Sequence, residues 1–75
     1  MGKILELVSK GKESLENGQY QEALGYFEQA ILLNQNDSEL WNFKAVSLRS
    51  MGRYDEAIEC FNKSLEIDPR DKNAS

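Results

Sequence analysis

Apolar side chains recur along this chain at intervals of three and four residues, the spacing that places them on one face of an α-helix. Four such stripes follow one another, separated by short polar or glycine-containing segments. The residues that define the stripes are Ile4, Leu7, Val8, Gly11 and Leu15; Ala23, Leu24, Phe27, Ala30, Ile31 and Leu33; Leu40, Trp41, Ala45, Leu48 and Met51; and Ala57, Ile58, Phe61, Leu65 and Ile67. The pattern predicts four amphipathic helices and an all-α fold.

Helix-ending signals lie between the stripes. Gly18 follows the first stripe and Gly52 the third, and we expect both to adopt the left-handed conformation that ends a helix. The polar segment 34–37 follows the second stripe. Asp68-Pro69 ends the fourth, because the residue before a proline is disfavoured in helical geometry. The candidate N-cap residues of the third helix are Asn36, Asp37 and Ser38.

One segment of the chain occurs twice. The sequence Gly-Gln-Tyr-Gln-Glu-Ala-Leu-Gly-Tyr-Phe at 18–27 is matched by Gly-Arg-Tyr-Asp-Glu-Ala-Ile-Glu-Cys-Phe at 52–61, an offset of 34 residues. A fixed period of that length is typical of stacked helical repeats. Extending the offset divides the chain into a first repeat at 4–37, a second at 38–71 and a polar tail at 72–75 that we expect to be frayed.

Composition narrows the function. The 75 residues carry a net charge of −4, and the nine Lys and Arg are scattered, which disfavours nucleic acid or anionic lipid as partners. No apolar run approaches the roughly 20 residues of a membrane span, and the first residues lack a secretory stretch, so we expect a cytoplasmic protein. With no histidine and one cysteine, we expect no metal, no cofactor and no catalysis, and we interpret Cys60 as a buried, inert thiol.

The order of the large, small and turn residues in the second repeat resembles the tetratricopeptide repeat. The residues that carry the resemblance are Trp41, Ala45, Leu48, Gly52, Tyr54, Ala57, Phe61 and Pro69. The resemblance covers 4–71 and implies two antiparallel helix-turn-helix repeats stacked as a short right-handed α-solenoid. Leu7, Ser14 and Gln35 stand where the family favours Trp, a large apolar residue and Pro. Lys10 and Lys44 occupy a position that is usually apolar, and we expect their stems to pack while their ammonium groups reach water.

Small residues are expected where the two helices of each repeat approach closely. Gly11 and Ala45 lie on the first helix of their repeats, and Ala23 and Ala57 lie on the second. Without side-chain bulk at these positions, the helix backbones can pack tightly.

In the family resembled, the first helix of each repeat lines a concave surface that holds extended peptides or partner helices. Transferred by position, that surface comprises Leu5, Val8, Ser9, Lys12, Glu39, Asn42, Phe43, Val46 and Arg49. Such a surface would suit a protein or peptide with an apolar anchor beside a carboxylate, because Phe43 offers apolar area and Arg49 can bind an acid with two hydrogen bonds. The alternative is that Phe43 and Val46 only pack on neighbouring helices and that Lys12 and Arg49 are ordinary solvated charges. Val8, Lys12 and Phe43 also stand where one subclass uses Lys, Asn and Asn to hold chaperone C-termini, so that mode is not expected.

Self-association is the second function considered. Repeats of this kind bury their apolar face by stacking, usually in threes or more, and an edge of Ile58, Leu65 and Ile67 would be covered by a following helix. Either the chain is a piece of a longer array or another copy covers this edge. A homo-oligomer could form by end-to-end stacking, or by domain exchange in which the second and third helices merge across 34–37, where no proline or glycine interrupts.

Overall fold

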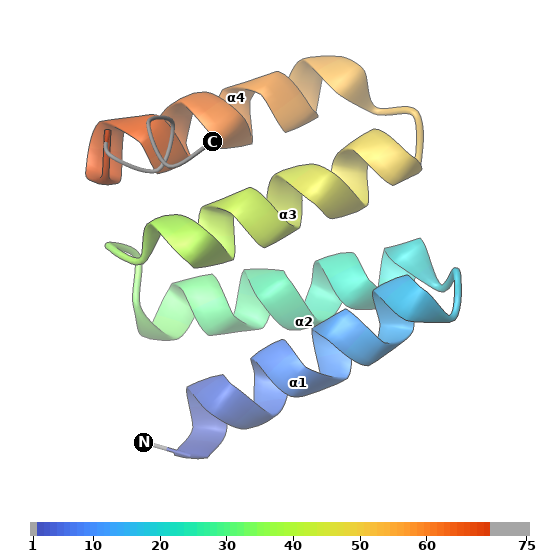
Figure 1. The fold of residues 1–75 in the computed structure, drawn as a ribbon. Helices are drawn as coiled ribbons and strands as arrows, with labels where there is room; N and C mark the ends of the chain where they lie inside the picture. Colours follow the sequence, from blue (N-terminus) through green and yellow to red (C-terminus); the bar gives the residue numbers. More distant parts are fainter. Residues whose placement is uncertain (1, 70–75) are drawn as a thin grey trace.

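A computed structural model describes residues 2–69, which form four α-helices and no strand. The helices are α1 (Gly2–Glu16), α2 (Tyr20–Leu33), α3 (Ser38–Ser50) and α4 (Tyr54–Ile67). They lie side by side in chain order, each antiparallel to the one before and packed against it (Figure 1). The all-α class and the two stacked helix-turn-helix units are therefore confirmed. The tail expected at 72–75 lies outside the described residues.

The turn inside each repeat is built on a glycine with positive φ. Gly18 has φ 78° and Gly52 has φ 82°, as the sequence predicts. The amide of the next residue, Gln19 or Arg53, donates to the carbonyl five residues earlier, at 2.8 and 2.9 Å respectively. This is the hydrogen bond of a Schellman motif, which satisfies a carbonyl at the helix end. Both repeats thus reverse the chain in the same way.

Asp37 is the N-cap of α3. Its side chain accepts a hydrogen bond from the Glu39 amide at 3.0 Å, and this satisfies one of the amides that the first helical turn leaves unpaired. Of the three candidates in the sequence, the structure therefore selects Asp37. None of the four helices in the described range is long and apolar enough to cross a lipid bilayer.

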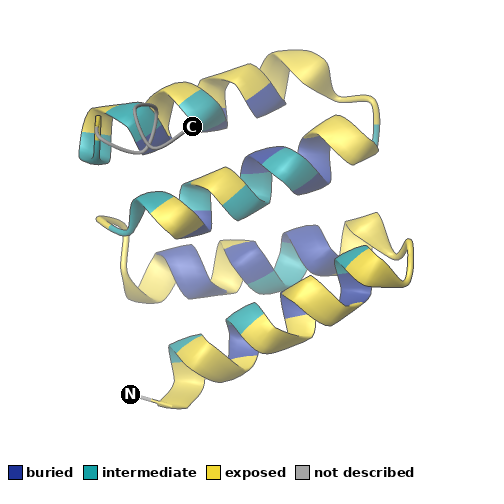
Figure 2. Cartoon of the chain, viewed as in Figure 1, coloured by how far each residue is buried: buried dark blue, intermediate teal, exposed yellow. Residues whose placement is uncertain are grey.

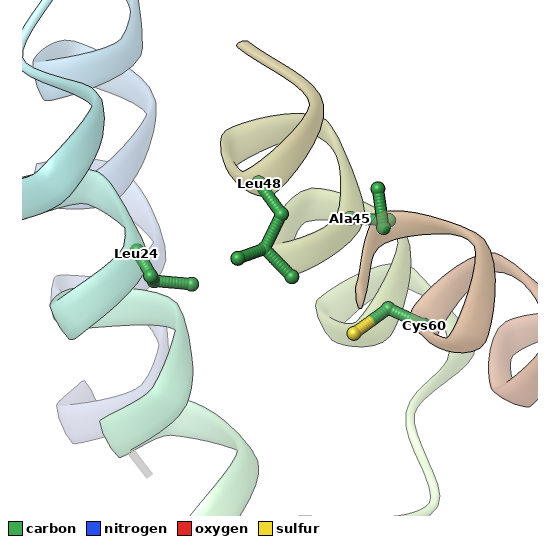
Figure 3. Packing of buried hydrophobic residues seen from close by; sticks show 5 residues of the cluster. Leu24, Ala45, Leu48 and Cys60 are labelled. Carbon is green, nitrogen blue, oxygen red and sulfur yellow. The ribbon is translucent and has the colours of Figure 1, made fainter. Parts of the chain in front are cut away.

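Buried residues lie mainly on the helix faces that meet a neighbouring helix (Figure 2). They form two clusters. One comprises Leu24, Ala45, Leu48, Ala57 and Cys60, several of which Figure 3 shows between α2, α3 and α4; the other comprises Leu7, Ala30, Ile31 and Leu40. Trp41 is half-buried and packs against both clusters. The core is therefore continuous across the two repeats.

Gly11 confirms the expected close approach between α1 and α2. A Cβ added to Gly11 would lie 2.6 Å from two atoms of the Phe27 ring, and Phe27 is fully buried. In the second repeat a buried serine joins the helices: the Ser64 hydroxyl of α4 donates to the Ser38 carbonyl at the start of α3, at 2.9 Å.

Candidate functional site

The sequence-predicted groove residues lie on α1 and α3, and we call them the α1–α3 surface. Val8, Phe43 and Val46 are half-buried, whereas the other members are exposed: Leu5, Ser9, Lys12, Glu39, Asn42 and Arg49. One contact joins the two helices directly, because the Lys12 ammonium nitrogen lies 5.2 Å from the centroid of the Phe43 ring. Residues separated by a whole helix in the chain therefore meet on this surface.

Phe43 has a packing role in addition to any role in binding. Its ring stacks on the buried ring of Phe27 in α2, with centroids 5.0 Å apart and an angle of 10° between the ring planes. Val8 packs against the cluster that contains Leu7 and Leu40. Phe43 and Val8 therefore pack within the fold. This packing does not decide between a binding surface and the alternative that Phe43 and Val46 only pack.

Two cations of the α1–α3 surface lie over aromatic rings instead of beside acids. Arg49 places its guanidinium carbon 5.8 Å from the centroid of the Phe61 ring, and Lys12 covers Phe43 as described. Neither forms an ion pair within residues 2–69. Cations over aromatic faces are held electrostatically while their N–H groups stay available. The arrangement can therefore accept an external carboxylate.

Three of the five other cations in residues 2–69 are matched by glutamates, whereas Lys3 and Lys10 are not. Lys44 lies 3.5 Å from Glu28, and Lys63 lies 4.0 Å from Glu66. Arg53 donates two hydrogen bonds of 2.8 Å to the two carboxylate oxygens of Glu56. These hydrogen bonds lower the pKa of Glu56 and raise the pKa of Arg53. Lys44, Arg53 and Lys63 thus have glutamate partners, whereas Lys12 and Arg49 of the α1–α3 surface have none within residues 2–69.

A hollow that the sequence reasoning missed lies around Trp41. It has a volume of about 470 Å³ and is lined by Glu28, Ile31, Leu32, Gln35, Trp41 and Lys44. The indole N–H of Trp41 donates to the Gln35 carbonyl at 2.9 Å, and Lys44 and Lys63 lie 5.4 and 6.0 Å from the indole centroid. The sequence feature that could have indicated this hollow is Lys44, because it stands at a usually apolar position. Its side chain is 23% exposed and its ammonium group reaches Glu28.

The three residues expected to form a self-association edge do not share one face of α4. Ile58 is exposed, and Leu65 is half-buried on the same side of the helix. Ile67 follows Ile58 by nine residues, which is a rotation of about 180°, and it lines a shallow depression with Pro69 and the α2–α3 turn. The apolar edge of α4 is therefore formed without Ile67.

The acidic side chains and the single cysteine are the remaining groups to consider as metal ligands or reactive groups. Among residues 2–69 no group of three or more His, Cys, Asp or Glu side chains could hold a metal ion. Cys60 is buried, and its desolvation raises the pKa of the thiol. A raised pKa keeps the thiol protonated at neutral pH, which agrees with the interpretation of Cys60 as inert.

Comparisons with known proteins match this architecture. Sequence profiles of the tetratricopeptide repeat match residues 5–37 and 38–71. An uncharacterized protein of Methanocaldococcus jannaschii is 44% identical over 59 residues, which cover 79% of this chain and 69% of the relative. The Hsp70-Hsp90 organizing protein of Triticum aestivum is 31% identical over 64 residues, covering 85% of this chain and 11% of the relative.

The peroxisomal targeting signal receptor of Candida glabrata is 30% identical over 53 residues, covering 71% of this chain and 9% of the relative. The chain thus spans about a tenth of these two larger proteins, and the similarity concerns their repeats. The two profile matches, the 34-residue offset and the paired antiparallel helices agree with one another. The chain belongs to the tetratricopeptide repeat family.

Proposed function

We propose that the protein binds other proteins without catalysing a reaction, and that the α1–α3 surface holds a peptide or helix carrying a carboxylate beside an apolar side chain. The observation that supports this most directly is the placement of Lys12 and Arg49 over aromatic rings, with no acidic partner in residues 2–69. An arginine of this kind can bind a carboxylate through two parallel hydrogen bonds. Half-buried Val46 and Phe43 supply apolar area next to it.

The relatives favour a role in protein binding. One is named an organizing protein for Hsp70 and Hsp90, and another is named a receptor for a targeting signal. Both names describe recognition of other proteins. Because the fold is shared by proteins with different ligands, the carboxylate preference is proposed from the cations of this chain and not from its relatives.

Peptide binding by Arg49 variants tests the proposal. The probes are two fluorescent octapeptides with a central leucine flanked by glutamates in one and by glutamines in the other, and the measurement is fluorescence anisotropy. Arg49→Gln should weaken binding of the glutamate peptide about ten-fold, since a charge-assisted pair is worth roughly 1.5–3 kcal/mol at most. Binding of the glutamine peptide should change little.

Lys63→Gln is the matched control, because Lys63 also lies over an aromatic ring but outside the α1–α3 surface. Equal affinity of the protein for the two peptides, or an equal loss in Lys63→Gln, would refute the carboxylate site. Phe43→Ala is unsuitable for this test, since removing a ring stacked on Phe27 would also lower stability.

Structural self-assembly is the second candidate function, and the exposed Ile58 on α4 favours it. Domain exchange is the less favoured of its two routes, because hydrogen bonds hold the α2–α3 turn closed. Asn36 N–H donates to the Asn34 side chain at 3.2 Å, and the Trp41 indole donates to the Gln35 carbonyl. A continuous helix across 34–37 would break both bonds and remove the Asp37 cap.

A further inference from the structure

The contact between α2 and α3 shows how this chain joins one repeat to the next. Three side chains of α2, at positions spaced for one helix face, share a ring contact or a core cluster with three side chains of α3. Leu24 and Leu48 share a cluster and point toward each other (Figure 3). The other two pairs are Phe27 with Phe43, which stack, and Ile31 with Leu40, which share the second cluster.

The same three positions recur on α4, and there they are uncovered. At the 34-residue offset, the positions equivalent to Leu24, Phe27 and Ile31 are occupied by Ile58, Phe61 and Leu65. Leu24 is 7% exposed under α3, whereas Ile58 is 55% exposed. Phe27 and Ile31 are buried, whereas Phe61 and Leu65 are only half-buried. We call the α4 side chains Tyr54, Ile58, Phe61 and Leu65 the α4 edge; Tyr54 extends it by one turn and is 63% exposed.

The opposite end of the molecule does not complement this edge. In α1, the offset places Glu6, Ser9 and Ser14 where α3 has Leu40, Phe43 and Leu48. If α1 of one copy covered α4 of another, Glu6 would be buried against apolar side chains, and an unpaired buried carboxylate is strongly disfavoured. The two ends of the chain are therefore unlike, and end-to-end stacking of copies is disfavoured.

We propose that the α4 edge binds the α4 edge of a second copy, forming a closed two-fold dimer. A two-fold interface needs a patch that complements itself, so that each contact occurs twice. Two antiparallel α4 helices centred between Phe61 and Asn62 bring Ile58 of each copy opposite Leu65 of the other. The proposal rests on self-association, the second candidate function. The α4 edge adjoins the α1–α3 surface, because the Arg49 guanidinium carbon lies 5.8 Å from the centroid of the Phe61 ring.

Repulsion between like charges opposes this dimer, so its dissociation constant should depend on the salt concentration. Each copy carries a net charge of −4, and Asp55, Glu59 and Glu66 add exposed carboxylates to α4 itself. Salt screens repulsion between like charges, while the apolar contact does not depend on such charges. The dissociation constant should therefore fall as sodium chloride rises from about 0.05 to 0.5 M.

Sedimentation equilibrium of the full chain measures the association. We expect a monomer–dimer equilibrium with a dissociation constant on the order of tens of micromolar, because one helix face is a small interface. Ile58→Glu should raise that constant at least about ten-fold. Leu32→Glu is the matched control, since Leu32 is 76% exposed on α2 outside the edge, and it should leave the constant unchanged. If Ile58→Glu does not fold by circular dichroism, Tyr54→Lys takes its place.

Two further variants identify the geometry. Asn62→Cys, combined with Cys60→Ala, should form an oxidised dimer on a non-reducing gel, whereas Gln29→Cys in the same background should not, because Gln29 lies on α2 away from the edge. Gln35→Pro should leave the dimer intact, since Asn34 already has the extended backbone that a proline requires of its predecessor (φ −153°, ψ 96°).

Four contrary results would each refute a different part of the proposal. Mass that continues to grow with concentration would indicate end-to-end stacking, and a dimer lost in Gln35→Pro would indicate domain exchange. A dimer that persists in Ile58→Glu would leave self-association standing and refute the α4 edge. A monomer at 0.5 M salt and about 500 µM protein, well above the expected dissociation constant, would refute self-association itself.

Discussion

At Gly11, α1 lies so close to α2 that an added methyl group would overlap the Phe27 ring. Phe27 cannot move away easily, because it is fully buried and stacked on Phe43. The absence of a side chain at one position thus sets the distance between two helices. Gly25 differs, since a Cβ there would meet nothing within 4 Å.

These two glycines predict opposite effects of the same substitution. Gly11→Ala should lower the free energy of unfolding by about 1–3 kcal/mol through overpacking. Gly25→Ala should raise it by about 0.5–1 kcal/mol, because alanine restricts the unfolded chain and favours helix. Urea denaturation followed by circular dichroism measures both. A neutral Gly11→Ala would contradict the close packing of α1 on Phe27.

Phe43 and Cys60 differ in how far their roles could be predicted from the sequence. Phe43 shows the limit of sequence reasoning at this scale: its position on the first helix of the repeat was predicted, but its stacking on Phe27 depends on how α2 and α3 cross. We interpret Cys60 as an inert thiol because the sequence has no histidine and no metal-ligand spacing beside it. Burial raises the pKa of this thiol.

At the scale of elements, the two repeats end their first helix with the same glycine turn. Gly18 and Gly52 end their helices with the same positive φ and the same hydrogen bonds. These turns were predictable because glycine is the residue that reaches this conformation without steric cost. The N-cap of α3 was narrowed to three residues but not to one, since the choice depends on which side chain reaches the Glu39 amide.

The Asp37 cap is open to a direct test. Asp37→Ala should lower the free energy of unfolding by about 1 kcal/mol, because the Glu39 amide loses its acceptor. Asp37→Asn keeps a side-chain oxygen and should retain most of the stability. Urea midpoints of the two variants and the parent give the comparison. Equal losses in both variants would show that the charge, and not the capping hydrogen bond, stabilises α3.

The edge of α4 could have been defined better from the sequence. Ile58 and Leu65 are seven residues apart and share a face, whereas Ile67 lies half a turn away from Ile58. The comparison with α2 also needed the structure, because only the pairing of Leu24, Phe27 and Ile31 with α3 showed which face of the helix receives the next one.

At the scale of the whole molecule, Trp41 joins the two core clusters. It packs partly buried against both, and its indole ties α3 to the α2–α3 turn through Gln35. Neighbouring repeats stabilise each other through such interfaces. Two repeats that share one interface have little means of unfolding separately.

Unfolding should therefore be cooperative. Urea transitions followed by Trp41 fluorescence and by far-ultraviolet circular dichroism should coincide, since the first reports the junction and the second reports all four helices. The measurement is made well below the concentration at which dimers form, so that association does not contribute. Separate midpoints would show that one repeat unfolds while the other persists.

The sequence by itself determined the four helices, their turns and the two repeats. These features follow from local conformational preferences and from a period that a linear chain records directly. Only the tertiary structure decided that Lys12 lies over Phe43, that Trp41 borders a hollow and that α4 leaves Ile58 uncovered while α1 presents Glu6. Such contacts join residues from different helices, and their positions depend on helix crossing, which no local pattern encodes.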